Sequence, residues 1–507
     1  MAEYEILIEE CIRTRLTSND VKEPLVMSRL ARAFGLQDAT QAGIGLAKTL
    51  AMVLPAFAIV FQVSTTFWTI FIAESLGGGD YLAGITIVSF LVVIQLIVQT
   101  IFDYPTGALG DHIGQRWVIA SALFCYAIAF WITSTLTYTT EFIVYVAIYG
   151  LMGFGASQES GAFHAWFDNN YRVAMPQDKD RKAYGVFWGK VGFIWQISST
   201  LVLIPGSIIA TIFFRQLVFQ IQAIACILLA FVVLSIIKDL PGAREVSESK
   251  SFKEYAGLMK DGVRFLFSSR FVSLVLFGEV FLWAIGTVWW QIVLFPLYFA
   301  YLFNDVTVSS FRTLVFFPEA FGQERSGVIA QRFDPVKWTP RLRFFQFLGV
   351  VFNILLAAII FAMPPPTEAV DIIGLYIFDV PIIEMPVQSV LPIVLLFIIF
   401  IITDLIGGIA NILNQRVFLD VVPNRIRNSI YSLQPTIAMM MAIPFILLFG
   451  WLLPLHGFPT TFMLMAIVTL FGTLLIVQGF RNPIPQAELV VPAEEEAIEI
   501  VGDLEVT

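Results

Sequence analysis

Long, continuously apolar runs recur along almost the whole chain, and they constrain its fold more than any other feature. Several of them reach the ~20 residues that a helix needs to cross a bilayer. Of the 507 residues, 58% are hydrophobic and only 14% are charged, whereas about a quarter are charged in a typical soluble protein. The runs do not alternate as the strands of a membrane β-barrel do. The sequence therefore predicts an all-α polytopic membrane protein that lies within a lipid bilayer.

Twelve spans are predicted, in two sets of six. We expect an N-terminal cytosolic segment over residues 1–45, a six-helix bundle over 46–237, a cytosolic linker over 238–270, a second six-helix bundle over 271–480 and an acidic cytosolic tail over 481–507. The spans are expected near residues 49–72, 82–104, 117–136, 142–166, 185–237 (two spans), 271–299, 306–331, 344–363, 389–413, 429–452 and 459–480. Residues 364–388, an external segment on this count, contain no Lys or Arg.

The basic residues alternate between loops in a way that tests this count. Among the loops that follow odd-numbered spans, the only basic residue is Arg215. The loops that follow even-numbered spans contain the others, namely Arg116 and the segments 172–182, 238–270, 332–343 and 416–427. Cytosolic loops are enriched in Lys and Arg, so we expect both termini to be cytosolic. Without the eighth span every later loop would change sides, and we therefore keep that span although it contains four charged residues.

The decapeptide from Gly107 to Arg116 lies between the second and third runs. Because charged side chains are costly in lipid, we interpret it as a short polar turn at the membrane surface. Its candidate functional residues are Gly107, Gly110, Asp111, Gly114 and Arg116. A weaker copy of the pattern follows the eighth span, at Gly327 and Gln331. The copy suggests that the two halves are an internal repeat, a plan known from transporters.

Residues 105–116 resemble the signature between helices 2 and 3 of the major facilitator superfamily, which is roughly Gly-x-Leu-Ala-Asp-Arg-x-Gly-Arg-Arg. Residues 160–168 are similar to the end of helix 4 in many members, and residues 423–432 to the segment that leads into helix 11. The chain departs from the signature at His112 and Gln115. The resemblance implies the fold of this superfamily and a secondary transporter whose two halves rock about a central site. It also implies that helices 1, 4, 7 and 10 line the cavity.

Asp111 is the candidate for a cytosolic gate. Its carboxylate would accept hydrogen bonds from N–H groups at the start of the eleventh span, near Asn428, because a helix N-terminus favours an anion. The alternative is a solvated loop carboxylate. Contacts at cytosolic helix ends are further expected from His164, Asp168, Arg425 and Arg427, with Arg116 or Arg172 as the partner of Asp168.

Ionisable residues within the spans are candidates for a substrate and proton cavity. They are Glu159, Glu279 and Asp404, with Trp283 and Asn411 nearby. A carboxylate beside aromatic rings suits an organic cation, and a buried carboxyl group can relay a proton. The alternatives are structural: Glu159 pairs with Lys190, Trp289 and Trp290 form an interfacial belt, and Arg312 pairs with Glu319.

We expect a secondary active transporter, a monomer in the plasma membrane, that exports a small cationic or neutral amphipathic compound by proton coupling. Nutrient uptake, or a transport-inactive binding or signalling protein on the same scaffold, are the alternatives. The chain has no nucleotide-binding loop and no hydrolase elbow, so an enzyme is not expected. Its cysteines Cys11, Cys125 and Cys226 are scattered and form no metal-binding cluster, and we expect neither a metal nor a cofactor. Nothing in the sequence suggests nucleic-acid binding.

Overall fold

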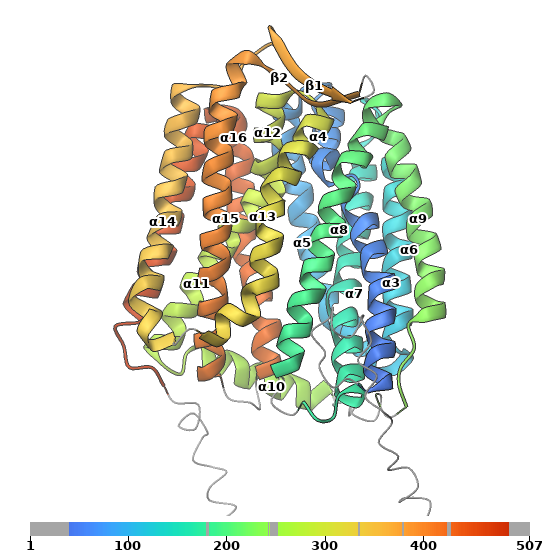
Figure 1. The fold of residues 1–507 in the computed structure, drawn as a ribbon, viewed down its shortest axis with the longest axis vertical. Helices are drawn as coiled ribbons and strands as arrows, with labels where there is room; N and C mark the ends of the chain where they lie inside the picture. Colours follow the sequence, from blue (N-terminus) through green and yellow to red (C-terminus); the bar gives the residue numbers. More distant parts are fainter. Residues whose placement is uncertain are drawn as a thin grey trace, which may run out of the picture.

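The computed structural model describes residues 40–178, 182–241, 243, 252–332, 335–377, 380–422 and 427–485. In this part of the chain, long helices run side by side between the two ends of a bundle (Figure 1). A two-stranded sheet covers one end, which we call the hairpin end. The helix α10 (Phe252–Leu266) lies at the opposite end, which we call the linker end.

The helices of the first half come before α10 in the sequence. They are α3 (Gln41–Gln62), α4 (Thr65–Leu76), α5 (Tyr81–Ile113), α6 (Gln115–Thr133), α7 (Phe142–Ala174), α8 (Lys182–Ile212) and α9 (Arg215–Ile236). The first two continue one another across a short break, where the Ser64 hydroxyl donates to the Gln222 side chain of α9 at 2.7 Å. The broken pair α3–α4 therefore corresponds to the first predicted span.

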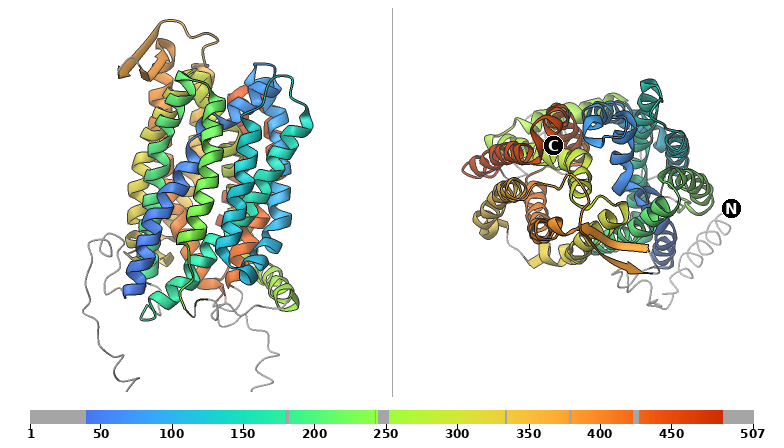
Figure 2. Two further views of the ribbon diagram at one scale, coloured as in Figure 1. Left: turned by 90° about the vertical axis from the view of Figure 1, so that its right-hand side faces the viewer. Right: turned by 90° about the horizontal axis from the view of Figure 1, so that it is seen from above.

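The second half follows α10. It contains α11 (Arg270–Val288), the π-helical turn η1 (Trp289–Val293), α12 (Leu294–Leu302), α13 (Asp305–Arg332), α14 (Pro335–Ala362), α15 (Val387–Val421) and α16 (Arg427–Gly479). The long α16 is two helices joined at Gly457, whose φ of 71° reverses the chain. Seen from above, the two halves lie side by side (Figure 2, right).

The helices match the predicted spans in order, including the eighth, which is α13. Within the described residues, seven stretches are long and apolar enough to cross a membrane by length and composition alone. Apolar helices of 10–17 residues at 347–362 and 387–403 fall short of that length. The predicted all-α membrane fold is confirmed, and the described helices are consistent with twelve spans.

The prediction of a short polar turn at residues 107–116 is wrong. The helix α5 continues to Ile113, well beyond the predicted end of the second span at Tyr104, and only Gly114 separates it from α6. Similarly, α7 runs on to Ala174, beyond the predicted end of the fourth span at residue 166. A helix satisfies its own backbone hydrogen bonds whether lipid or water surrounds it. The apolar run thus limits the membrane-embedded length of a helix but does not end the helix.

Small residues allow close helix contacts within each half. A Cβ atom on Gly153 of α7 would lie 2.4 Å from the Gln95 carbonyl oxygen of α5, and one on Gly278 of α11 would lie 2.7 Å from the Gly472 carbonyl oxygen of α16. Such approach of backbones is typical of helix pairs in membranes. It explains why the predicted fourth span has glycine at Gly153, whereas a Cβ on Gly150 would meet nothing within 4 Å.

Residues 364–388, predicted as an external segment, contain an antiparallel hairpin of β1 (Ile372–Ile377) and β2 (Val380–Pro386). The strands pair Ile373 with Met385, with a bulge at Leu375/Tyr376. The Glu384 N–H donates to the Thr307 hydroxyl at 2.8 Å, which fixes the hairpin to α13. The hairpin thus lies against the same end of α13 that contacts the first half.

Candidate functional site

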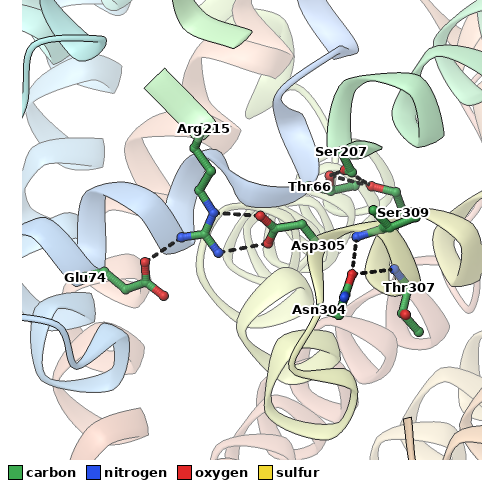
Figure 3. A network of polar contacts seen from close by, with 9 residues as sticks. Thr66, Glu74, Ser207, Arg215, Asn304, Asp305, Thr307 and Ser309 are labelled. Carbon is green, nitrogen blue, oxygen red and sulfur yellow. Dashed lines mark hydrogen bonds and ion pairs between the residues drawn. The ribbon is translucent and has the colours of Figure 1, made fainter. Parts of the chain in front are cut away.

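A partly buried ion-pair cluster joins the two halves at the hairpin end. Arg215, the first residue of α9, donates from Nε to one carboxylate oxygen of Asp305 at 2.6 Å and from a terminal nitrogen to the other oxygen at 2.9 Å. Its remaining terminal nitrogen contacts Glu74 at the end of α4. Figure 3 shows the guanidinium between the two carboxylates. Because Glu74 and Arg215 belong to the first half and Asp305 to the second, this cluster bridges the halves.

A group of hydroxyls lies next to this cluster (Figure 3). The Thr66 hydroxyl of α4 lies 2.8 Å from the Ser309 hydroxyl of α13, and the Ser207 hydroxyl of α8 contacts both. All three side chains are buried. Since each hydroxyl is both a donor and an acceptor, the group can exchange partners with little reorganisation.

Further hydrogen bonds extend the contact between the halves. Thr86 of α5 donates to the Gly450 carbonyl of α16 at 2.9 Å, and Thr313 of α13 to the Thr200 carbonyl of α8 at 3.3 Å. Thr69 of α4 lies 3.5 Å from the Gln291 carbonyl in η1. Together with the ion-pair cluster and the hydroxyl group, we call these contacts the hairpin-end seam. Apart from the ion pairs, the contacts of the seam join short hydroxyl side chains to one another or to backbone carbonyls, and water can replace such partners.

The helix α11 changes to a π-helical turn where it meets this seam. Trp289 in the turn packs on Phe400 and Phe462, with ring centroids 5.4 and 5.8 Å apart. Trp290 packs on Phe295 and Phe316. Both tryptophans are half-buried and contact rings of the second half. Single π-helical turns are frequent at functional sites.

The predicted cavity residues come from both halves. Glu159 lies on α7 and Glu279 on α11, and both are half-buried. The Glu159 carboxylate is close enough to the Tyr126 phenol of α6 for an electrostatic interaction. Trp283 is 51% exposed. Asp404 and Asn411 lie on α15, but their side chains lie outside the described part of the structure.

The structure places the predicted gate residues at the junction of α5 and α6. Gly114 has φ 98° and ψ 137°, and its N–H bonds the Gly110 carbonyl at 2.9 Å. Arg116 lies over the Trp117 ring, with its guanidinium carbon 5.6 Å from the ring centroid. Gly107 lies in the last turns of α5. The Asp111 side chain and its expected contact at Asn428 lie outside the described residues.

Of the expected contacts at cytosolic helix ends, one ion pair is described. Arg172 lies 2.9 Å from the Asp168 carboxylate, one turn earlier on α7. The sequence named Arg116 and Arg172 as alternatives, and this pair favours Arg172. The side chains of His164 and Arg427, and the whole of Arg425, lie outside the described residues.

Arg312 has surroundings that the sequence did not predict. It is only 6% exposed, and its guanidinium carbon lies 3.4 Å from the Phe316 ring centroid and 5.4 Å from that of Trp290. The predicted pair with Glu319 is not described, because the Glu319 side chain is outside the described part. Sequence reasoning also missed the Glu74–Arg215–Asp305 cluster. Its signal was that Arg215 is the single basic residue in the loops after odd-numbered spans.

Comparisons with known proteins identify the relatives of this chain. A family model described as Major Facilitator Superfamily matches residues 50–394. The crystal structure of the nucleoside transporter NupG is similar, with a TM-score of 0.59 and 14% identity, covering 86% of this chain and 100% of that one. A mutant of the same transporter gives a TM-score of 0.59 and 13% identity, covering 85% and 100%. At such identities the likeness shows the fold alone. No curated protein matches the chain.

Proposed function

Because this chain belongs to the Major Facilitator Superfamily, a membrane transporter family, we propose that it is a secondary active transporter of a small molecule that works by alternating access. The hairpin-end seam supports this proposal more than any other observation. It closes one end of the molecule with contacts between the halves, and the Arg215–Asp305 pair is its strongest part. Rocking of the halves would open that end by separating these residues.

The seam has the chemistry of a contact that forms and breaks. A hydrogen bond between uncharged groups stabilises a protein by only about 0.5–1.5 kcal/mol net, because water replaces the partner when it opens. The bonds of Thr66, Thr86 and Thr313 across the halves are of this kind. Polar contacts of this size suit an end that opens in every transport cycle.

We assign the hairpin end to the outside of the cell and the linker end to the cytosol, with both termini cytosolic and the protein in the plasma membrane as a monomer. The distribution of Lys and Arg supports this orientation. The single basic residue of the loops after odd-numbered spans, Arg215, lies in the hairpin-end cluster, whereas α10 at the linker end contains Lys253, Lys260 and Arg264.

At the linker end we propose the gate that the sequence predicts at Asp111, where α5 ends. The expected partner is the start of α16, near Asn428. If this contact holds the cytosolic end closed, Asp111→Asn shifts the protein towards the state that is open to the cytosol. The rate at which a thiol reagent modifies a cysteine introduced on the cytosolic side of the cavity measures the shift. Unchanged transport together with an unchanged modification rate would contradict the gate.

Flux into proteoliposomes that contain the purified full-length chain tests the transport function. A panel of small cationic, neutral and anionic compounds is offered with and without a pH gradient, in both directions. We expect at least one compound to cross faster than in protein-free vesicles, with a rate that depends on the pH gradient, and we propose export as the physiological direction. Binding without any flux would favour the transport-inactive alternative, and flux that ignores the pH gradient would refute proton coupling alone. Uptake driven by the gradient would favour a nutrient permease.

The charge of the substrate is set by the ionisable groups that line its site. The sequence predicts a cationic or neutral compound from the carboxylates at residues 159, 279 and 404. Glu159 and Glu279 lie in different halves and are both only half-buried. To bind one cation together, the two carboxylates would both have to extend to it from opposite halves. Arg312 is more deeply buried than either carboxylate. Its positive charge would favour a negative group on the substrate.

A further inference from the structure

Arg312 lies directly beside the hairpin-end seam, on the side nearer the middle of the bundle. It follows Ser309, a seam residue, by one turn of α13. Its neighbour Thr313 donates to the Thr200 carbonyl of α8. This part of α13 therefore faces the first half of the molecule. In a transporter of this kind, the space beneath a closed end is where a substrate lies between the two halves.

The guanidinium of Arg312 rests on aromatic rings. The ring of Phe316, one turn further along α13, lies closest, and Trp290 in η1 completes the contact. The residue after Trp290, Gln291, is contacted by Thr69 of the first half through its carbonyl. The rings of Phe316 and Trp290 therefore lie where the two halves meet.

The charge of Arg312 has no counter-charge among the residues that the structure describes. No hydrogen bond or ion pair to it is found there, and its Nε atom is buried without a partner. Arg215, by contrast, contacts two carboxylates. Arginine is almost never fully buried unless it is paired, because removing a charge from water is costly. Attraction to the ring faces offsets part of that cost but satisfies none of the N–H donors.

We propose that Arg312 binds an oxyanion of the transported substrate, a carboxylate or a phosphate group. A guanidinium that rests on a ring keeps its in-plane N–H groups available, and they match the two oxygens of such a group. The inference rests on the proposed transport function and gives its substrate a negative group, instead of the positive one predicted from the sequence.

Binding to the purified full-length chain tests the inference with four probes of similar size. Phenylacetate and phenyl phosphate carry the two oxyanions, 2-phenylacetamide is neutral, and phenethylamine is a cation. We expect at least one of the two anions to raise the thermal unfolding temperature, and neither of the other probes to do so. Which of the two anions raises the unfolding temperature shows whether the site prefers a carboxylate or a phosphate. Absence of a response to both anions overturns the inference.

Arg312→Gln separates a binding role from a structural one. It should bind the responding anion at least about tenfold more weakly, the loss expected for a charge-assisted hydrogen bond, while its unliganded unfolding temperature stays the same or rises. Arg312→Lys keeps the positive charge but cannot donate the bidentate pair of hydrogen bonds that a guanidinium forms. It should bind the anion with intermediate affinity. Arg172→Gln, which breaks an ion pair on α7, is the control and should respond like the wild type. If Arg312→Gln binds the anion as tightly as the wild type, Arg312 is not the binding group.

Flux distinguishes failure of this inference from failure of the transport proposal. If an anion binds through Arg312 and no compound of the panel crosses the proteoliposome membrane, the transport proposal fails and the anion site stands. If neutral or cationic compounds cross equally well with the wild type and Arg312→Gln, and no anion crosses, transport stands and the anion site fails.

Discussion

Gly114 determines how the chain passes from α5 to α6. Its backbone, at φ 98° and ψ 137°, lies in a region that side chains with a Cβ rarely adopt. The turn therefore depends on this one glycine of the predicted gate motif. Gly107, in the same motif, is helical, and a Cβ there would meet nothing within 4 Å. The two glycines consequently differ in what they contribute.

Gly114→Ala should lower the stability of the protein by about 1–3 kcal/mol, the cost of holding a residue in such a conformation. Gly107→Ala should leave stability unchanged or raise it slightly, because alanine is the better helix former by about 1 kcal/mol. Thermal unfolding of the two variants in the same detergent measures the difference. Equal unfolding temperatures would show that the α5–α6 turn accommodates a side chain.

Arg312 and Arg215 are two arginines with little exposure that differ in their charged partners. Both guanidinium groups lie close to aromatic rings, Arg215 with its carbon 5.7 Å from the Phe299 ring centroid. Only Arg215 has carboxylate partners among the described residues. The two arginines therefore differ in role: Arg215 supports closure of the hairpin end, and Arg312 is proposed to contact the ligand.

At the scale of elements, the ion-pair cluster connects α4 and α9 of the first half to α13 of the second. The side chain of Asp305 is 9% exposed, and those of Arg215 and Glu74 are 17% and 23% exposed. The cluster has one positive and two negative charges. Removing the cation would leave two nearby carboxylates without compensation.

Arg215→Gln should therefore weaken the hairpin-end seam. Breaking a fully buried ion pair costs about 3–5 kcal/mol, and the partial exposure of Glu74 reduces that figure here. We expect faster alkylation of a cysteine introduced at Thr313, in a background without Cys11, Cys125 and Cys226. The triple variant Arg215→Gln, Glu74→Gln, Asp305→Asn should recover part of the closure because no charge is left unpaired. An alkylation rate that Arg215→Gln leaves unchanged would mean that the cluster does not hold this end closed.

The hairpin β1–β2 belongs to the same group of elements. Its Glu384 backbone contacts Thr307, and its Glu384 side chain lies 3.4 Å from the Asn304 amide. Asn304 in turn accepts a hydrogen bond from the Val306 N–H at the start of α13. The hairpin thus supports the end of the helix that supplies Asp305 and Ser309 to the seam.

At the scale of the whole molecule, coupling requires a group that changes protonation as the halves move. Glu159 is the better of the two described candidates. It is half-buried on α7, and no ion pair between it and Lys190 is described. Glu279 lies in the second half and has an interaction of its own. A carboxylate that no cation of the described residues neutralises can bind a proton.

Glu159→Gln should therefore remove the dependence of flux on the pH gradient while substrate exchange continues, because the amide cannot release a proton. Glu279→Gln is the matched control in the other half and should retain gradient-driven flux. Proteoliposomes with equal and unequal pH on the two sides provide the measurement. Gradient-driven flux that survives in Glu159→Gln would assign the proton to another group.

The sequence alone determined the class of fold, because the length and apolarity of each run are local properties that lipid selects directly. A long helix, α13, lies where the alternation of charged loops predicted the eighth span. The sequence did not predict how far α5 and α7 continue beyond the lipid, since the backbone of a helix is satisfied in either solvent.

Only the tertiary structure decided which polar side chains meet. Arg215 is 141 residues from Glu74 and 90 from Asp305, and nothing in the local sequence of any of them specifies the others. The aromatic surroundings of Arg312, and the lack of a counter-charge for it among the described residues, likewise follow from the packing of η1 against α13. The burial and pairing of a side chain depend on every element around it. For this reason Arg312, for which the sequence predicted a structural pair, is instead the candidate for binding the substrate.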